Sequence, residues 1–189
     1  GAELTATLIE ASGFEKLEGL VTLSSLDNET YEINAQTFDK VILACGAWLG
    51  QTLEPLGFEV DVRPQKGQLR DYFFEGLDTG KLPVLMPEGE LDIIPFAGGK
   101  ISVGASHEND KGFDLTVDEA VLEGLEEEAK IYFPDLSTAK SFSERVGTRA
   151  YTSDFSPFFG EVPELKNVFV ASGLGSSGLT TGPLIGKNL

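Results

Sequence analysis

The chain has 189 residues, of which 41% are hydrophobic, and this is enough to build a core as one domain or two small ones. Its formal net charge of −17, from 31 acidic and 14 basic residues, argues against nucleic acid as a partner, because phosphate binding needs a basic surface. A single histidine and a single cysteine allow neither an internal disulfide nor a zinc cluster, and this cysteine usage favours the reducing cytoplasm.

The start of the chain shows no signal peptide, and no apolar run reaches the length of about 18 residues that predicts a membrane span. Because no initiator methionine is present, we interpret the chain as a piece of a longer protein. A meander of strands with polar turns is expected over residues 3–10, 17–25 and 29–36. The residues Leu26-Asp27-Asn28 predict a hairpin turn between the last two strands.

A short apolar run follows at residues 41–45 and is closed by Gly46. This pattern is typical of a buried strand in an α/β sheet. Residues 47–53 are then expected to form a short helix that ends before Pro55. Cys45, at the end of the strand, is interpreted as a buried thiol and not as a nucleophile, because no histidine lies near it in the sequence.

The composition changes after Gly57, and the next part of the chain predicts an antiparallel sheet. Its strands, about five of them, are expected over residues 58–63, 67–74, 83–87, 91–96 and 100–105. A helix follows, with a start predicted from the capping-box pair Thr116 and Glu119 and an end predicted from Pro134. The apolar residues with helical spacing are Val117, Ala120, Val121, Leu125, Ala129 and Tyr132.

The last part of the chain returns to mixed structure. We expect a strand over residues 141–151, a loop over 152–163 and an apolar strand over 167–172. The next residues, 173–178, match G-x-G-x-x-G and lead into the start of a helix, a pattern that brings backbone close to a cofactor. A Rossmann phosphate loop would instead open a βαβ unit and have an acidic residue about 20 positions later. Only residues 179–189 follow here, and none of them is acidic.

Two apolar strands therefore end in glycine turns, one at Gly46 and one at Gly173. Ligands of parallel α/β sheets bind beyond the carboxyl ends of the strands, so two such ends could hold one extended cofactor. In the alternative interpretation, the glycines serve only to make tight turns. If one ligand touches both turns, they must lie on the same side of the molecule.

The order of these segments is more specific than any one motif. A strand with Gly46-Ala47-Trp48 is followed by Arg63-Pro64-Gln65-Lys66-Gly67-Gln68, an antiparallel sheet, a capped acidic helix, the run from Arg145 to Gly160 and the closing glycine turn. This order resembles the D-amino-acid oxidase and glycine oxidase superfamily of FAD-dependent oxidoreductases. The resemblance covers nearly the whole chain and lacks only the first half of the family pattern, which carries the dinucleotide fingerprint.

The resemblance implies an α/β (mixed α+β) fold, with a partial FAD-binding α/β domain and an inserted, mainly antiparallel β-sheet substrate domain. Residues 1–57 and 147–189 would belong to the FAD-binding domain, and residues 58–146 to the substrate-binding domain. The closing turn would lie at the isoalloxazine ring, with the helix N-terminus facing its pyrimidine end. The residues implied to bind the cofactor are Gly46, Ala47, Trp48, Gly173, Gly175, Ser176, Ser177, Gly178 and Leu179.

Three residues are candidates for catalysis. Arg149 occupies the position of the family arginine, in Gly147-Thr148-Arg149, that often binds a substrate carboxylate, and a guanidinium suits this task because it binds carboxylates in bidentate fashion. The alternative for Arg149 is an internal salt bridge. His107 follows a strand and could line the pocket or act as a base, or it is a surface loop histidine. Tyr151 could close the pocket, or its ring is part of the core.

These observations predict a piece of an FAD-dependent oxidoreductase that oxidises a small amino or imino acid by hydride transfer to flavin. Without the phosphate-binding half, the chain alone is expected neither to bind FAD tightly nor to turn over. The expected partners are a small-molecule substrate only, with no nucleic acid and no membrane span, and the oligomeric state stays open. Two alternatives remain: a non-catalytic binding or regulatory module of the same fold, and a flavoenzyme that acts on a hydroxy acid or a modified-tRNA amine.

Overall fold

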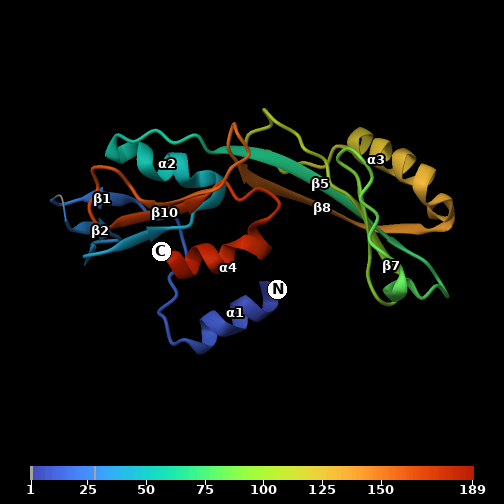
Figure 1. Ribbon diagram of the computed structural model, residues 1–189, viewed down its shortest axis with the longest axis horizontal. Helices are drawn as coiled ribbons and strands as arrows, with labels where there is room; N and C mark the ends of the chain where they lie inside the picture. The colour runs from blue at the N-terminus through green and yellow to red at the C-terminus, as the bar shows by residue number, and fades with distance from the viewer. Residues whose placement is uncertain (1, 28) are drawn as a thin grey trace. The chain divides into compact units, whose positions relative to one another are not determined.

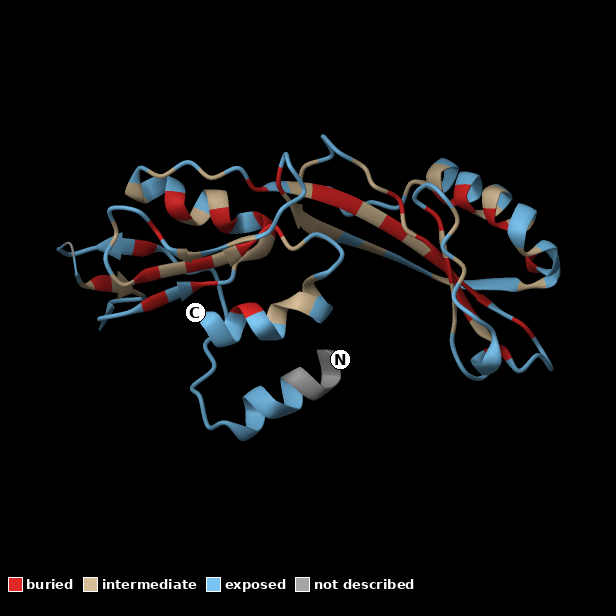
Figure 2. Ribbon diagram, viewed as in Figure 1, coloured by how far each residue is buried: buried red, intermediate tan, exposed pale blue. Residues whose placement is uncertain are grey.

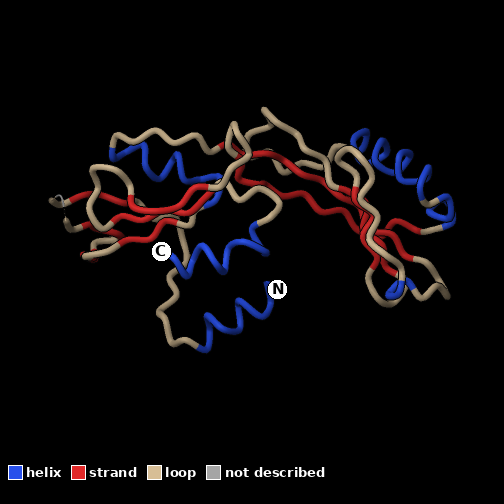
Figure 3. The backbone as a smooth tube through the Cα atoms, in the orientation of Figure 1, coloured by secondary structure: helices blue, strands red, loops and turns tan. Residues whose placement is uncertain are grey.

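The computed structural model describes residues 2–27 and 29–189, so Asn28 of the expected hairpin turn lies outside the described residues. Its contacts divide the chain into two compact units. The first unit is formed by residues 1–63 together with 150–189, and the second by residues 64–149. Figure 1 labels the main elements of both units, and Figure 3 distinguishes their helices from their strands.

The first unit contains two three-stranded sheets, in the orders β1-β2-β3 and β4-β10-β9. Strand β10 pairs in parallel with β4 and antiparallel with β9. The strands and helices of this unit are α1 (Ala2–Ala11), β1 (Leu23–Ser25), β2 (Tyr31–Ile33), β3 (Gln36–Phe38), β4 (Val41–Leu43), α2 (Leu49–Leu53), β9 (Phe158–Glu161), β10 (Val168–Ser172) and α4 (Gly178–Asn188), with short 3-10 helices at Gly46–Trp48 and Glu54–Leu56.

The expected meander at the start of the chain is partly wrong. Residues 3–10 form helix α1, in agreement with their content of alanine, leucine and glutamate, which are good helix formers. The segment 17–25 is strand only at its end, in β1, which pairs antiparallel with β2 as the hairpin prediction required. The segment 29–36 contains β2 and the start of β3, because Asn34 and Ala35 adopt positive φ angles of 52° and 60° and turn the chain.

The sheet β4-β10-β9 has one face in the core of the first unit. Residues of β4 and β10 alternate in burial, and Val41, Leu43, Val168 and Val170 pack with Leu49 and Leu53 of α2 and with residues of β1 and β2. Figure 2 shows this alternation as bands along β10. The opposite face carries residues such as Ile42, which is 54% exposed. The predictions of a buried strand over 41–45 and of an apolar strand over 167–172 are confirmed, although β4 itself ends at Leu43.

The second unit is a four-stranded sheet in the order β6-β7-β5-β8, packed against helix α3. Its elements are β5 (Arg63–Phe73), β6 (Asp92–Pro95), β7 (Lys100–Gly104), α3 (Glu119–Tyr132) and β8 (Lys140–Tyr151), with 3-10 helices at Thr79–Lys81 and Pro134–Thr138. The ends of β5 and β8 continue into the first unit through Arg63 and through Ala150 and Tyr151. The second core lies between β5, β6 and β7 and the apolar face of α3.

Several expected strand positions differ from the structure. Residues 58–62 form no strand, and the expected strand 83–87 is reduced to one isolated bridge between Leu85 and Ile93. The fourth strand of the sheet is β8, from the far side of α3 in the sequence. Conversely, the expected loop 152–163 contains β9, which pairs with β10. Short apolar runs thus became strands only where a partner edge was available.

The capping box predicted for α3 is also wrong. The N-cap is Asp118, whose carboxylate accepts hydrogen bonds from the backbone N–H groups of Ala120 and Val121. Thr116 bonds to Asp114, and the side chain of Glu119 meets Arg70. Of the expected apolar face, Leu125 and Ala129 are buried and Val121 packs at the core edge, whereas Val117, Ala120 and Tyr132 are exposed. The helix ends before Pro134, as predicted.

A buried carboxylate ties β5 to β7 and β8 in the second unit. Asp71 is 1% exposed and accepts hydrogen bonds from Ser102, Ser143 and Arg145, while Lys100 Nζ lies 3.0 Å from its Oδ2 atom. Burial alone would raise the pKa of Asp71, but the hydrogen bonds from Ser102, Arg145 and Ser143 outweigh it. The pKa therefore lies well below its usual range.

We therefore expect Asp71→Asn to destabilise the protein at pH 7 by about 2 kcal/mol, because the amide leaves cationic and hydroxyl donors poorly matched. A carboxyl group with a lowered pKa in the folded state stabilises the fold above the unfolded-state pKa, and this contribution is lost as the pH falls toward the folded-state value. The difference in unfolding free energy between wild type and variant should therefore shrink below about pH 4. Urea denaturation of both proteins between pH 7 and pH 3 measures this difference in unfolding free energy. A difference that is constant with pH would contradict this account.

Candidate functional site

The two glycine turns lie at the same edge of one sheet. β4 and β10 are parallel neighbours, with Val41 opposite Val168 and Leu43 opposite Val170, so both strands end on the same side. The Ser172 hydroxyl donates a hydrogen bond of 2.9 Å to the carbonyl oxygen of Gly46, which joins the two turns directly. The requirement that one ligand be able to reach both turns is therefore met.

A pocket of about 370 Å³ opens in the first unit between these turns and helix α4. Glycine, alanine and aliphatic residues dominate its wall, and the helix contributes one side of it. Its lining residues are Ile42, Ala44, Gly46, Ala150, Ala171, Ser172, Gly173, Leu174, Gly175, Gly182, Ile185, Gly186 and Leu189. An apolar cleft at the carboxyl ends of parallel strands is a typical place for a flat organic ligand.

The structure separates the residues expected to bind the cofactor into two groups. Three of them, Gly46, Gly173 and Gly175, line the pocket. The others lie outside its wall: Ala47 is buried, Trp48 is about half exposed, Leu179 is largely exposed, and Ser176, Ser177 and Gly178 form the entry to α4. The helix itself points its N-terminus, at Gly178, toward the end of the turn, where the N–H groups of the first helical turn favour negative charge.

Backbone conformation explains why this turn needs glycine. Gly173 has a φ of +73°, and a Cβ there would lie 2.7 Å from the Cγ2 atom of Thr152. Gly175 has a φ of +54°, and its N–H donates a hydrogen bond of 2.9 Å to the carbonyl oxygen of Ala150. By contrast, a Cβ on Gly46 or Gly175 would meet no atom within 4 Å, so the backbone there faces open space that a ring could occupy.

Arg149 lies in the second unit, near the end of β8. Its Nη1 atom donates a hydrogen bond of 2.8 Å to the carbonyl oxygen of Ser106. Burial lowers the pKa of Arg149, and the charges of Glu90 and Asp92 oppose this shift. Among residues 2–27 and 29–189, no carboxylate lies within 4 Å of its guanidinium, so the expected alternative of an internal salt bridge is not found there.

The guanidinium of Arg149 lies directly over the backbone of Gly67 in β5. A Cβ at this position would come within 2.5, 2.8 and 2.9 Å of three guanidinium atoms, so only glycine allows the approach. Sequence reasoning did not select Gly67. An isolated glycine inside a strand often marks a close approach of another group, and that signal was present in Lys66-Gly67-Gln68.

The other two catalytic candidates lie in different units. His107 follows Ser106, its backbone N–H donates to Glu90 Oε2 at 3.1 Å, and its Nδ1 atom lies 3.6 Å from the same oxygen. His107 therefore directly follows Ser106, the residue whose carbonyl accepts the hydrogen bond from Arg149 in the second unit. Tyr151 belongs to the first unit, where its ring stacks on Phe155 with a centroid distance of 6.0 Å.

Comparison with known proteins identifies the family. A family model described as FAD dependent oxidoreductase, DAO, matches residues 2–189. The chain belongs to the DAO family of FAD-dependent oxidoreductases. The resemblance inferred from the order of the motifs is thereby confirmed, as is the mixed α/β fold.

Relatives of this DAO-family chain are longer proteins. It is 38% identical over 169 residues to the uncharacterized oxidoreductase YurR of Bacillus subtilis, covering 89% of this chain and 45% of YurR. It is 32% identical over 145 residues to glycine oxidase of Pseudomonas aeruginosa, covering 77% and 39%. The crystal structure of iminodiacetate oxidase from Chelativorans sp. BNC1 superimposes with a TM-score of 0.91 at 30% identity, covering 97% and 52%. The chain thus spans about half or less of these relatives.

The first unit of this DAO-family chain fits one part of a flavin site. The pocket, the open backbone at Gly46 and Gly175 and the helix N-terminus suit a flat ring that gains negative charge on reduction. None of the helices in residues 2–27 and 29–189 combines the length and the hydropathy of a membrane span. The same part of the chain holds no group of three or more His, Cys, Asp or Glu residues that could bind a metal ion.

Proposed function

We propose that the protein to which this chain belongs oxidises a small amino or imino acid by hydride transfer to FAD. The observation that carries the proposal is that Arg149 is partly buried and has no carboxylate partner among the described residues. No carboxylate of the described chain lies within 4 Å of its guanidinium, and its one hydrogen bond to a described residue runs from Nη1 to the Ser106 carbonyl. A partly buried cation with donors left for a ligand is a ready partner for the carboxylate of a substrate.

In this proposal Arg149 holds the substrate carboxylate through two parallel N–H···O bonds and so fixes the orientation of the α-carbon. Orientation of this kind contributes much of the rate in reactions whose chemistry is done by a cofactor. FAD, when bound, supplies the acceptor for the hydride. Gly46, Gly173 and Gly175 would contact its ring system, while Ala47, Trp48 and residues 176–179 would shape the approach to it.

The remaining candidates receive supporting roles. His107 would take a proton from the substrate ammonium, and Glu90, 3.6 Å from its Nδ1 atom, would stabilise the resulting cation. Tyr151, stacked on Phe155, would cover the substrate.

We assign the first unit to the FAD-binding domain and the second unit to the substrate-binding domain. We place the protein in the cytoplasm on the basis of its single cysteine.

Anaerobic reduction tests this function. The full-length protein is expected to be yellow and to be bleached by one member of a panel that contains glycine, iminodiacetate and L-proline. Bleaching by glycolate alone, or by a modified-tRNA amine alone, would instead favour the flavoenzyme that acts on a hydroxy acid or a modified-tRNA amine. A folded but colourless protein would contradict the proposal and favour a non-catalytic module. The 189-residue chain alone is expected to contain no stoichiometric flavin.

A further inference from the structure

The direction of the Arg149 guanidinium depends on one backbone group in the second unit. Its only hydrogen bond within the described chain runs from Nη1 to the carbonyl oxygen of Ser106, at 2.8 Å. The guanidinium also lies against the backbone of Gly67, which makes no hydrogen bond to it among the described residues. Any movement of the Ser106 carbonyl would therefore redirect the donors that Arg149 offers to a substrate.

Ser106 is held mainly by the backbone of Gln68 in β5. The Ser106 backbone N–H donates to the Gln68 carbonyl at 3.1 Å, and the Ser106 hydroxyl accepts from the Gln68 backbone N–H at 2.9 Å. The same hydroxyl donates to Glu108 Oε1 at 2.7 Å. Ser106 is 4% exposed, so these bonds lie away from water and are strengthened by the low local polarity.

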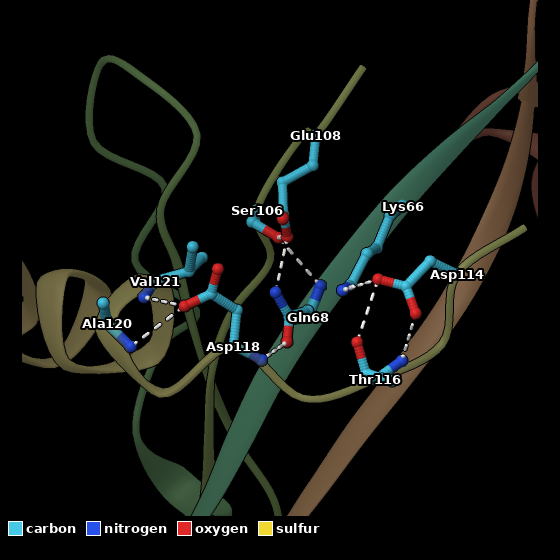
Figure 4. Close-up of polar contacts among 9 residues, drawn as sticks. All are labelled: Lys66, Gln68, Ser106, Glu108, Asp114, Thr116, Asp118, Ala120 and Val121. Carbon is cyan, nitrogen blue, oxygen red and sulfur yellow. Dashed lines mark hydrogen bonds and ion pairs between the residues drawn. The ribbon is translucent and has the colours of Figure 1, made fainter. Parts of the chain in front are cut away.

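The side-chain amide of Gln68 completes this arrangement. It is fully buried, and its Nε2 atom donates to Glu108 Oε1 at 2.6 Å while its Oε1 atom accepts from the backbone N–H of Asp118 at 2.7 Å. Figure 4 shows Gln68 between these groups, with Ser106 and Glu108 on one side and the N-terminus of α3 on the other. One amide therefore links the segment that carries Ser106 to the helix N-cap.

Other buried polar residues of β5 hold the same segment. The backbone of Lys66 pairs with that of Glu108, and its ammonium lies 3.3 Å from Asp114 Oδ2. Gln65 donates to Asn109 at 2.9 Å. A run of buried polar side chains inside a strand is costly unless each finds a partner, and these partners all lie between residues 106 and 118. Their common effect is to fix this segment on β5.

We propose that Gln68 is a positioning residue, whose buried amide sets the Ser106 carbonyl and through it the orientation of Arg149 toward a substrate carboxylate. The inference rests on the proposed function in assuming that Arg149 binds a carboxylate. Gln68 itself touches neither substrate nor cofactor in this role. Its amide acts through Glu108, whose Oε1 atom accepts hydrogen bonds from both the Gln68 amide and the Ser106 hydroxyl.

The test is a double-mutant cycle in the full-length protein. Gln68→Glu keeps the acceptor for Asp118 but places a second carboxylate against Glu108, which repels it. We expect the affinity for acetate, measured by calorimetry, and kcat/KM for the best amino acid to fall about tenfold, with most of the kinetic change in KM. In an Arg149→Lys background the same substitution should change either quantity less than about twofold. An equal effect in both backgrounds would overturn the inference.

Three further variants separate positioning from general damage. Gln68→Glu combined with Glu108→Gln conserves the charge and restores an amide–carboxylate pair, so the acetate affinity should largely recover. Gln65→Glu alters a buried glutamine of the same strand that bonds to Asn109 and to neither Ser106 nor Glu108, so it should lower the affinity much less than Gln68→Glu does. Should Gln68→Glu fail to fold, Ser106→Ala replaces it in the cycle, because it removes the hydroxyl that joins Ser106 to Glu108 and to the Gln68 backbone N–H.

The outcomes also distinguish this inference from the proposed function. If Arg149→Lys weakens acetate binding and Gln68→Glu does not, only the positioning role is wrong. If neither the wild type nor any variant binds acetate, the carboxylate role of Arg149 is wrong and the positioning role is wrong with it.

Discussion

Replacement of Arg149 by lysine should lower kcat/KM for the amino-acid substrate by about 100-fold or more. Lysine keeps the charge but offers a single ammonium, which cannot make two parallel bonds to a carboxylate and at the same time reach the Ser106 carbonyl. The structure adds a reason for a large effect, because the wild-type guanidinium lies on Gly67 and is oriented before substrate arrives. Steady-state kinetics and acetate binding measure the loss.

The matched control for this variant is Arg145→Lys on the same strand. The side chain of Arg145 is 52% exposed and bonds to Asp71, so lysine can retain its ion pair and kcat/KM should stay within about twofold of wild type. Full activity of Arg149→Lys would contradict the role of Arg149 in substrate binding. Equal losses in the two variants would indicate that any change in β8 disturbs the enzyme.

In the full-length protein, replacement of Gly173 by alanine should weaken FAD binding at least about tenfold and lower the unfolding free energy by about 2 kcal/mol. The residue combines a φ of +73° with a Cβ position 2.7 Å from Thr152, so the new methyl group must displace the turn or its neighbour. A displaced turn would carry the Gly175 N–H away from Ala150 and change the shape of the pocket. The ratio of flavin absorbance to protein, together with urea denaturation, measures both effects.

Gly124→Ala in α3 is the control for Gly173→Ala. Gly124 lies inside the helix in ordinary helical conformation, and a Cβ there would meet no atom within 4 Å. Alanine should therefore stabilise the protein by about 0.5–1 kcal/mol without changing its flavin content. If Gly173→Ala retains full flavin and stability, the turn does not have the cofactor role assigned to it.

Short sequence patterns correctly predicted the elements whose formation depends on residues close together in the chain. The apolar runs of β4 and β10 closed by glycine, the end of α3 before Pro134 and the hairpin joining β1 to β2 follow from burial patterns and turn chemistry within a few residues. The wrong predictions share another cause. Asp118 caps α3 in place of Thr116, and β8 joins the sheet in place of residues 83–87, because contacts with distant segments decided between local possibilities.

The features of the candidate site likewise fall into those predicted by short sequence patterns and those that depend on contacts between distant segments. The amino-acid sequence by itself determined the family, the two glycine turns and the position of Arg149, since each is carried by a short pattern of residue types. Only the tertiary structure decided that Ser172 joins the two turns, that Gly67 lies under the guanidinium and that Gln68 holds Ser106 in place. These contacts join residues far apart in the chain, and a buried polar group finds its partner only after the strands have paired and water has been excluded.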